Sequence, residues 1–221
     1  MRRFYIDTKQ GLSRDLVLTG SEHNHLANVL RLMAGDEIIA VCGDEFDYLY
    51  SILRITKNNT QLKFISKNEN PFNPRVKFTV YMGVIKHDNL ALAVSALNEI
   101  GATQIVLFKT ARAQNIPARI DKLQAIAQQS CKQCGRSIPL AVRGVISFEQ
   151  LLTEIPKDTI FADEKEESKQ VKSASAIIIG PEGGFTEQER ELLRKTATPV
   201  SLGGRILRAE TAAVVGAAKL L

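Results

Sequence analysis

Two glycine-rich turns near the C-terminus hold the residues best suited to chemistry. The first lies in "IIIGPEGGFTEQER", residues 177–190, where an apolar run ends and Gly183 and Gly184 precede the start of a helix. The second lies in "SLGGRILRAETAA", residues 201–213. A plain tight turn explains one glycine, because glycine tolerates positive φ and lets a ligand approach the backbone closely. A pair of glycines in each turn favours backbone that wraps around a flat, neutral or cationic group.

The first turn does not have the pattern of a phosphate-binding loop. A Walker loop requires Gly-Lys followed by Ser or Thr, and a dinucleotide loop requires G-x-G-x-x-G. Neither pattern occurs here, and Glu182, Glu187 and Glu189 would repel an anion. Thr186 and Glu189 have the spacing of a capping box, which gives them a structural role. The ligand is therefore predicted to be poor in phosphate.

The second turn ends in two arginines and a glutamate at the start of a helix rich in alanine and valine. Arg205 and Arg208 are three residues apart, and Glu210 follows. An arginine near a helix N-terminus opposes the helix dipole, so a purely structural position would favour an acid. Arg208 is therefore predicted to contact an anion or the edge of a base.

The order of elements after residue 75 predicts a parallel sheet. Strands are expected at 76–85, 104–110, 140–146, 159–163, 176–179 and 199–202, and helices at 89–101, 119–135, 148–155, 186–197 and 209–221. Alternation of this kind is typical of a mostly parallel sheet with helices on both faces. Such sheets form their sites at the carboxyl ends of the strands, so the two turns can line one crevice.

The first 67 residues are expected to form a small antiparallel barrel. Strands are expected at 36–43, 46–56 and 60–67, and a short helix at 21–35, capped by Ser21 and ended by Gly35. The segment "NENPFNPR", residues 68–75, is rich in proline and asparagine and is interpreted as a linker.

Composition and charge exclude several classes of protein. The 221 residues carry a net charge of +5, which is compatible with a nucleic-acid partner. No apolar stretch approaches the ~20 residues that span a bilayer, and "MRRFYIDTKQ" lacks the apolar core of a signal peptide, so a cytoplasmic location is expected. Cys131 and Cys134 have no second cysteine pair, and His23 and His25 favour a surface or RNA-facing role, so no metal site is expected.

Both turns together resemble the signature motifs of the RsmE family, the 16S ribosomal RNA (uracil-N3)-methyltransferases of the SPOUT class. "HLANVLRL" (25–32), "KTARAQN" (109–115) and "QSCKQCGRSIP" (129–139) are similar to further family segments, although Lys132 stands where the family has glutamate. The resemblance implies a PUA-like RNA-binding β-barrel over residues 1–70 and a SPOUT methyltransferase domain over 75–221. It also implies a C-terminal trefoil knot that binds S-adenosylmethionine, a homodimer, and 16S ribosomal RNA or the small ribosomal subunit as substrate.

The resemblance, together with the charge and chemistry of the side chains, suggests roles for residues. The expected catalytic residues are Arg208, which would stabilise negative charge on the uracil carbonyls, and Glu210, a candidate base for the N3 proton that is more readily explained by pairing with an arginine. The expected cofactor-binding residues are Gly180, Glu182, Gly183, Gly184, Leu202, Gly203, Arg205, Ile206, Leu207 and Thr211. The expected RNA-binding residues are Arg2, Arg3, His25, Arg31, Arg112, Gln133 and Arg136.

Two other functions remain open at this point. One is ribose 2′-O-methylation by an enzyme of the same class, although the early Asn-plus-Arg motif typical of those enzymes is not found after residue 75. The other is a non-catalytic RNA-binding or ribosome-assembly protein, which would have no need of the two glycine turns. Cofactor binding separates the last from the others, and the position of the methyl group separates the first two.

Overall fold

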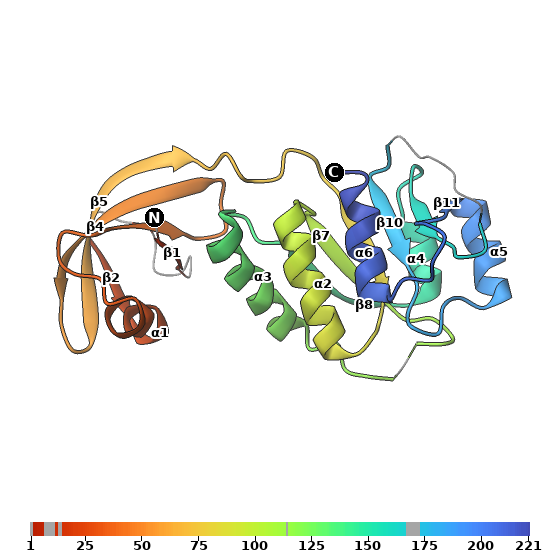
Figure 1. The fold of residues 1–221 in the computed structure, drawn as a ribbon, viewed down its shortest axis with the longest axis horizontal. Helices are drawn as coiled ribbons and strands as arrows, with labels where there is room; N and C mark the ends of the chain where they lie inside the picture. The colour runs from red at the N-terminus through yellow and green to blue at the C-terminus, as the bar shows by residue number, and fades with distance from the viewer. Residues whose placement is uncertain (1, 7–11, 13–14, 114, 167–172) are drawn as a thin grey trace. The chain divides into compact units, whose positions relative to one another are not determined.

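The computed structural model describes residues 2–6, 12, 15–113, 115–166 and 173–221 (Figure 1). The chain divides into two compact units. The first consists of Met1–Asn73 and Cys131–Pro139, and the second of Pro74–Ser130 and Leu140–Leu221. The first unit is therefore discontinuous in sequence, because the end of helix α3 (Ile120–Cys134) and the turn after it belong to it.

The first unit is built on a five-stranded sheet with the order β1-β3-β4-β5-β2. Its strands are β1 (Arg2–Tyr5), β2 (Asp15–Thr19), β3 (Glu37–Val41), β4 (Phe46–Ile55) and β5 (Asn59–Glu69). The three expected strands are confirmed. The expectation of an antiparallel barrel is wrong for one pair, because β1 pairs parallel with β3. The other pairs are antiparallel, and the β4–β5 ladder has register shifts at which a sheet twists more strongly.

The expected helix at 21–35 is shorter than its apolar pattern indicated. Helix α1 spans Gly20–Asn24, follows Thr19 rather than Ser21, and continues into a π-helical turn, His25–Val29. The apolar pattern consists of Leu26, Val29, Leu30 and Met33. Of these only Leu26 is fully buried, whereas Val29 and Met33 are 61% and 70% exposed. Little apolar burial would therefore stabilise the helix beyond Val29.

The second unit contains a six-stranded sheet with the order β11-β9-β10-β6-β7-β8. Its strands are β6 (Thr79–Gly83), β7 (Gln104–Phe108), β8 (Ala141–Ile146), β9 (Ile160–Ala162), β10 (Ala176–Ile179) and β11 (Thr198–Val200). Every strand pair is parallel, which confirms the sequence prediction.

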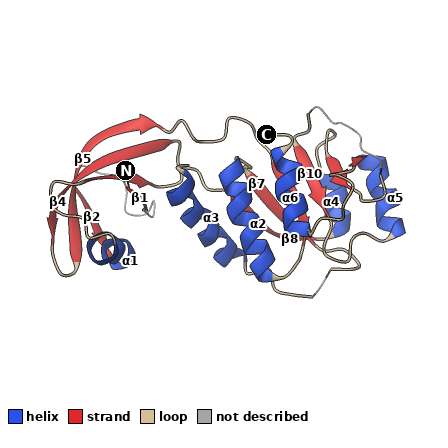
Figure 2. Cartoon of the chain, in the orientation of Figure 1, coloured by secondary structure: helices blue, strands red, loops and turns tan. Residues whose placement is uncertain are grey.

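Helices cover both faces of this sheet (Figure 2). Helices α2 (His87–Ile100), α3 and α6 (Ala209–Ala218) pack on one face, and α4 (Phe148–Glu154) and α5 (Glu187–Thr196) on the other. Alternate residues of β10 explain the two cores, because Ile177 and Ile179 pack toward α2 and α6 while Ala176 and Ile178 pack toward α4 and α5. None of the helices in the described ranges has the length and apolar character needed to cross a membrane.

Candidate functional site

A pocket of about 500 Å³ lies in the second unit, at the carboxyl ends of β9, β10 and β11. Both glycine turns contribute to its lining, as expected from their place after parallel strands. Most of the residues predicted to bind the cofactor or to act in catalysis line it, namely Gly180, Glu182, Gly183, Gly184, Leu202, Gly203, Arg205, Ile206, Leu207, Arg208 and Glu210. Thr211 does not line it and is exposed on the first turn of α6.

In the first turn, a side chain at Gly180 or Gly183 would meet other protein atoms. A Cβ at Gly180 would lie 3.1 Å from the ring of Phe185, and a Cβ at Gly183 would lie 3.1 Å from the Cβ of Arg112. Gly184 has φ of +63°, and its N–H donates to the carbonyl of Pro181 at 2.8 Å. Packing therefore explains why Gly180 and Gly183 have no side chain. Both line the pocket, and their contact with the cofactor stays a prediction.

The glycines of the second turn do leave space at the pocket. Gly203 has φ of +143°, and among the described residues no atom lies within 4 Å of a Cβ built at Gly203 or Gly204. Leu202 and Leu207 pack partly against the core of the unit, whereas Ile206 is 85% exposed. Gly203 lines the pocket, so a ligand can approach its open backbone closely.

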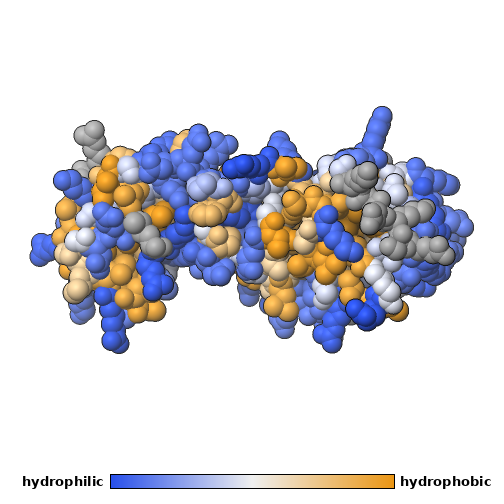
Figure 3. All heavy atoms as spheres, turned by 45° about the horizontal axis from the view of Figure 1, so that its top comes forward, coloured by the Kyte–Doolittle hydropathy of each residue, from blue (hydrophilic) through white to orange (hydrophobic). Residues whose placement is uncertain are grey.

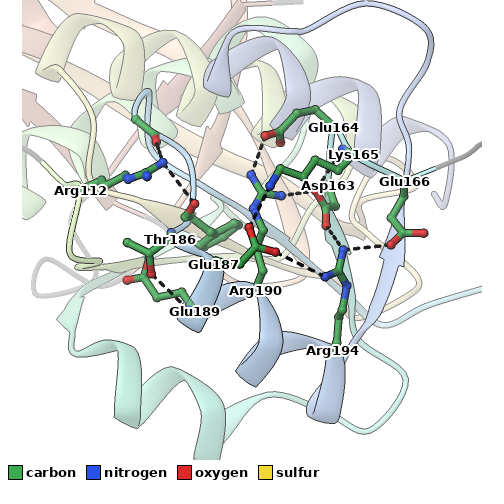
Figure 4. Close-up of polar contacts among 12 residues, drawn as sticks. Arg112, Asp163, Glu164, Lys165, Glu166, Thr186, Glu187, Glu189, Arg190 and Arg194 are labelled. Atoms are coloured by element: carbon green, nitrogen blue, oxygen red, sulfur yellow. Dashed lines mark hydrogen bonds and ion pairs between the residues drawn. The ribbon is translucent and has the colours of Figure 1, made fainter.

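A cluster of ion pairs forms another part of the pocket lining, and the sequence analysis missed it (Figure 4). The buried carboxylate of Asp163, just after β9, accepts hydrogen bonds from Arg190 and, at 3.0 Å, from Arg194. Arg190 also donates to Glu164 at 2.5 Å. Burial alone would lower the pKa of Arg190, but its bonds to Glu164 and Asp163 raise it above the ordinary value. Because Arg190 and Arg194 are four residues apart on one helix, their shared face was the available signal in the sequence.

The predicted capping box at the start of α5 is confirmed. The hydroxyl of Thr186 accepts from the N–H of Glu189 at 3.2 Å, and the carboxylate of Glu189 accepts from the N–H of Thr186 at 2.8 Å. This fixes the point at which the first turn becomes a helix.

Three charged side chains at the pocket form no hydrogen bond or ion pair with the described side chains. They belong to Arg205, Arg208 and Glu210. Arg208 is the extended residue that precedes α6, and it is exposed. None of the hydrogen bonds or ion pairs found among the described side chains involves any of the three. The Oε2 atom of Glu210 is buried without a hydrogen-bond partner in that part of the chain. The arginine partner expected for Glu210 is therefore not found among the described side chains.

The residues predicted to bind RNA separate into exposed and buried groups. Arg2, His25, Arg31, Arg112 and Gln133 are exposed, and Arg112 lies in the second unit, at the pocket. The side chains of three other residues form hydrogen bonds within the first unit. These residues are Arg3, Arg136 and His23.

These partners explain why the three side chains are not on the surface. Arg3 donates to both oxygens of Asp47, at 2.7 and 2.6 Å, and its side chain is 10% exposed. Arg136 is 2% exposed and donates through Nε to the carbonyl of Ile138 at 3.0 Å. His23 is buried, with Nδ1 2.8 Å from the hydroxyl of Thr60. The expectation of an RNA contact is thus corrected for Arg3 and Arg136, and that of a surface role for His23.

Asp47 organises the polar core of the first unit. Besides Arg3, it accepts from Asn70 at 2.7 Å and from the hydroxyl of Ser137 at 2.6 Å. Burial raises the pKa of Asp47, but the hydrogen bonds from Arg3, Ser137 and Asn70 outweigh burial and hold it below the ordinary value. Through Ser137, the segment 131–139 is joined to the sheet of this unit.

Lys132, which stands where the resemblance led us to expect glutamate, also holds this segment in place. Its ammonium group lies 2.5 Å from the carboxylate of Glu22, and the two side chains are 14% and 22% exposed. We expect Lys132→Glu to lower the free energy of unfolding by about 1.5–3 kcal/mol, because a charge-assisted hydrogen bond is lost and two acids then face each other. Urea unfolding of this variant should be compared with that of the double variant Glu22→Lys, Lys132→Glu. Recovery of stability in the double variant is expected, and equal losses in both would contradict the pairing.

Within the described ranges, no set of three or more His, Cys, Asp or Glu side chains is arranged to hold a metal ion.

Comparison with known proteins agrees with these features. Residues 72–221 match a family model described as an RNA methyltransferase domain, and residues 18–65 match an RNA methyltransferase PUA domain. The chain is 30% identical to the ribosomal RNA small subunit methyltransferase E of Rickettsia conorii, over 99% of this chain and 94% of that protein. It is also 30% identical to the enzyme of the same name from Bacillus subtilis, over 96% and 93% of the two chains.

A solved structure supports the fold. The ribosomal RNA small subunit methyltransferase E of Neisseria gonorrhoeae, bound to S-adenosyl methionine, superposes with a TM-score of 0.88 at 25% identity, over 98% of this chain and 96% of that chain. The N-terminal unit is thus PUA-like, and the parallel unit has the fold of the methyltransferase domain. The chain belongs to the RNA methyltransferase family that includes ribosomal RNA small subunit methyltransferase E.

Proposed function

We infer that this protein transfers a methyl group from S-adenosylmethionine to N3 of a uridine in 16S ribosomal RNA. The observation that carries this proposal is the pocket between the two glycine turns, in the unit that matches the RNA methyltransferase family. A relative with the same fold holds S-adenosyl methionine. Action on ribosomal RNA would place the protein in the cytoplasm, as the sequence led us to expect.

The pocket fits this cofactor in shape and charge. Gly203 and Gly204 leave open space beside their backbone, which suits a flat adenine ring, and Leu202 and Leu207 offer apolar contact. The carboxylate of Glu210 has no cationic partner among the described residues, which suits a ligand that carries positive charge. Gly203, Leu202 and Leu207 would therefore hold the cofactor, which when bound supplies an electrophilic methyl group.

Arg208 and Glu210 can assist the reaction at the uracil base. Methylation at N3 requires loss of the imide proton and leaves negative charge on the uracil carbonyl oxygens. Arg208, exposed at the pocket, can donate to a carbonyl oxygen as this charge develops. Glu210, in the first turn of α6, would accept the N3 proton. The target base must leave its stack to reach these groups, so an accessible loop or a flipped base is the expected substrate.

The same proposal includes a trefoil knot at the C-terminal edge of the sheet. Strand β11 is at the edge of the sheet, beyond β9, whereas the following helix α6 packs on β10, β6 and α2. The chain therefore turns back between its last strand and its last helix, which is compatible with threading of α6.

The proposal also includes a homodimer. The second unit exposes apolar side chains, including Leu92 on α2 at 63% and Leu221 after α6 at 46%, and apolar surface is visible in Figure 3. Exposed apolar surface of this kind is typical of an interface. Light scattering coupled to size exclusion should then give twice the mass of the chain.

A methyl-transfer assay tests the reaction itself. Labelled S-adenosylmethionine would be incubated with unmodified small ribosomal subunits and, separately, with naked 16S RNA, and the nucleosides identified by mass spectrometry. We expect 3-methyluridine, and the preferred substrate reports how much assembled structure the enzyme reads. A 2′-O-methyl nucleoside would favour the ribose methyltransferase, and cofactor binding without transfer to either RNA would contradict the proposed reaction.

A further inference from the structure

The loop after β7 holds the first glycine turn from the side opposite to β10. The Nη1 atom of Arg112 donates to the carbonyl oxygens of Gly183 and Phe185, at 3.2 and 3.3 Å. The N–H of Ala111 donates to Oε1 of Glu189 at 2.8 Å. One short loop therefore binds both the glycine turn and the first turn of α5. Figure 4 shows the two bonds of Arg112.

The turn reaches this loop by crossing the end of β6, which lies between β7 and β10 in the sheet. A Cβ at Gly83, the last residue of β6, would lie 2.6 Å from Pro181. A Cβ at Gly183 would lie 3.1 Å from the Cβ of Arg112 and 3.3 Å from its carbonyl oxygen. The two glycines thus allow the turn to lie directly on β6 and on the loop, with backbone against backbone.

Arg112 completes the restraint of two peptide groups in the turn. In the peptide between Gly183 and Gly184, the oxygen accepts from Arg112 and the N–H donates to Pro181 at 2.8 Å. In the peptide between Phe185 and Thr186, the oxygen accepts from Arg112 and the N–H donates to Glu189 at 2.8 Å. Each peptide is therefore held on both sides, and rotation of either requires a bond from Arg112 to break.

We propose that Arg112 is a positioning residue for the cofactor pocket, which clamps the first glycine turn in the conformation that binds S-adenosylmethionine. This role differs from the RNA contact expected from the sequence, and it rests on the proposed function of the pocket. Glu189 acts with it, because its two carboxylate oxygens join the loop at Ala111 to the turn at Thr186. The clamp is formed entirely within the second unit.

The test is to compare Arg112→Ala with Arg75→Ala, which removes the same charge from an exposed position of the same unit. Affinity for S-adenosylmethionine would be measured by calorimetry without RNA, and affinity for 16S RNA without cofactor. The clamp predicts that Arg112→Ala weakens cofactor binding roughly tenfold, because two hydrogen bonds from a charged donor are lost. RNA affinity should change equally in both variants. Arg112→Lys should recover part of the cofactor affinity, since an ammonium group can still donate to the carbonyls.

A second variant tests the clamp without a change of charge. Gly183→Ala would push the loop away from the turn and is expected to weaken cofactor binding in the same direction. Thermal unfolding of each variant would establish that the fold is kept. Unchanged cofactor affinity in both Arg112→Ala and Gly183→Ala would overturn the clamp, and a loss confined to RNA affinity would return Arg112 to the role expected from the sequence. Failure of the unaltered protein to bind S-adenosylmethionine would instead reject the proposed function, and the clamp with it.

Discussion

Arg208→Ala is expected to lower the rate of methyl transfer by about 10²–10³-fold, the typical effect of removing one preorganised donor from a developing anion. The reason is that the Arg208 guanidinium is exposed at the pocket and has no partner among the described side chains, so its donors are available to the substrate. Affinity for S-adenosylmethionine should change little, because the residue is expected to act on the base. Single-turnover rates and calorimetric affinities would be measured side by side.

The matched control for this prediction is Arg208→Lys. It keeps the charge but replaces the planar fork of donors with a point charge, so a rate between those of Arg208→Ala and the unaltered protein is expected. Equal rates for all three proteins would remove Arg208 from the mechanism. A loss of cofactor affinity as large as the loss of rate would assign Arg208 to cofactor binding.

Of the variants proposed for stability measurements, Arg190→Met should have the largest effect. It is expected to lower the free energy of unfolding by about 3–5 kcal/mol. The side chains of Arg190 and Asp163 are 3% and 0% exposed, so the substitution leaves a buried carboxylate with fewer partners. Glu164 loses its partner as well. Urea unfolding would measure the effect, and cofactor affinity should fall with it, because Asp163, Glu164 and Arg190 all line the pocket.

Arg194→Met is the control for the second prediction. Arg194 also donates to Asp163, but its side chain is 36% exposed, so water can replace it more easily. A markedly smaller loss of stability than in Arg190→Met is expected. Equal losses would mean that burial of Arg190 does not determine the strength of the cluster.

The sequence predicted the second unit well because its signals are local. Apolar runs of strand length alternate there with amphipathic segments, and Gly101 and Gly135 end α2 and α3 with φ of +103° and +92°. The same reasoning overestimated the helix after Ser21, because periodicity does not show whether an apolar stripe finds a core. It also gave no sign that β1 pairs parallel with β3.

The charged residues were harder to predict, since their partners are distant in sequence. Arg3 pairs with Asp47, and Arg190 with Asp163, 44 and 27 residues away. From the sequence, an arginine can be interpreted as a ligand for phosphate. Only the folded structure shows whether it already forms an ion pair with a carboxylate. The first glycine turn shows the same limit, because the close neighbours of Gly183 come from the loop after β7.

The discontinuous first unit has a consequence for dissection of the molecule. A fragment that ends at Asn73 would lack Ser137, Gly135 and Lys132, and would leave Asp47, Asn70 and Glu22 without these partners. Buried polar groups that lose their partners destabilise a fold, so such a fragment should not be an autonomous folding unit. Excision of the first unit would therefore require that residues 131–139 be grafted back, for example through a short linker. Unfolding of this unit in the whole protein must also release the end of α3, so the two units should not melt as independent transitions.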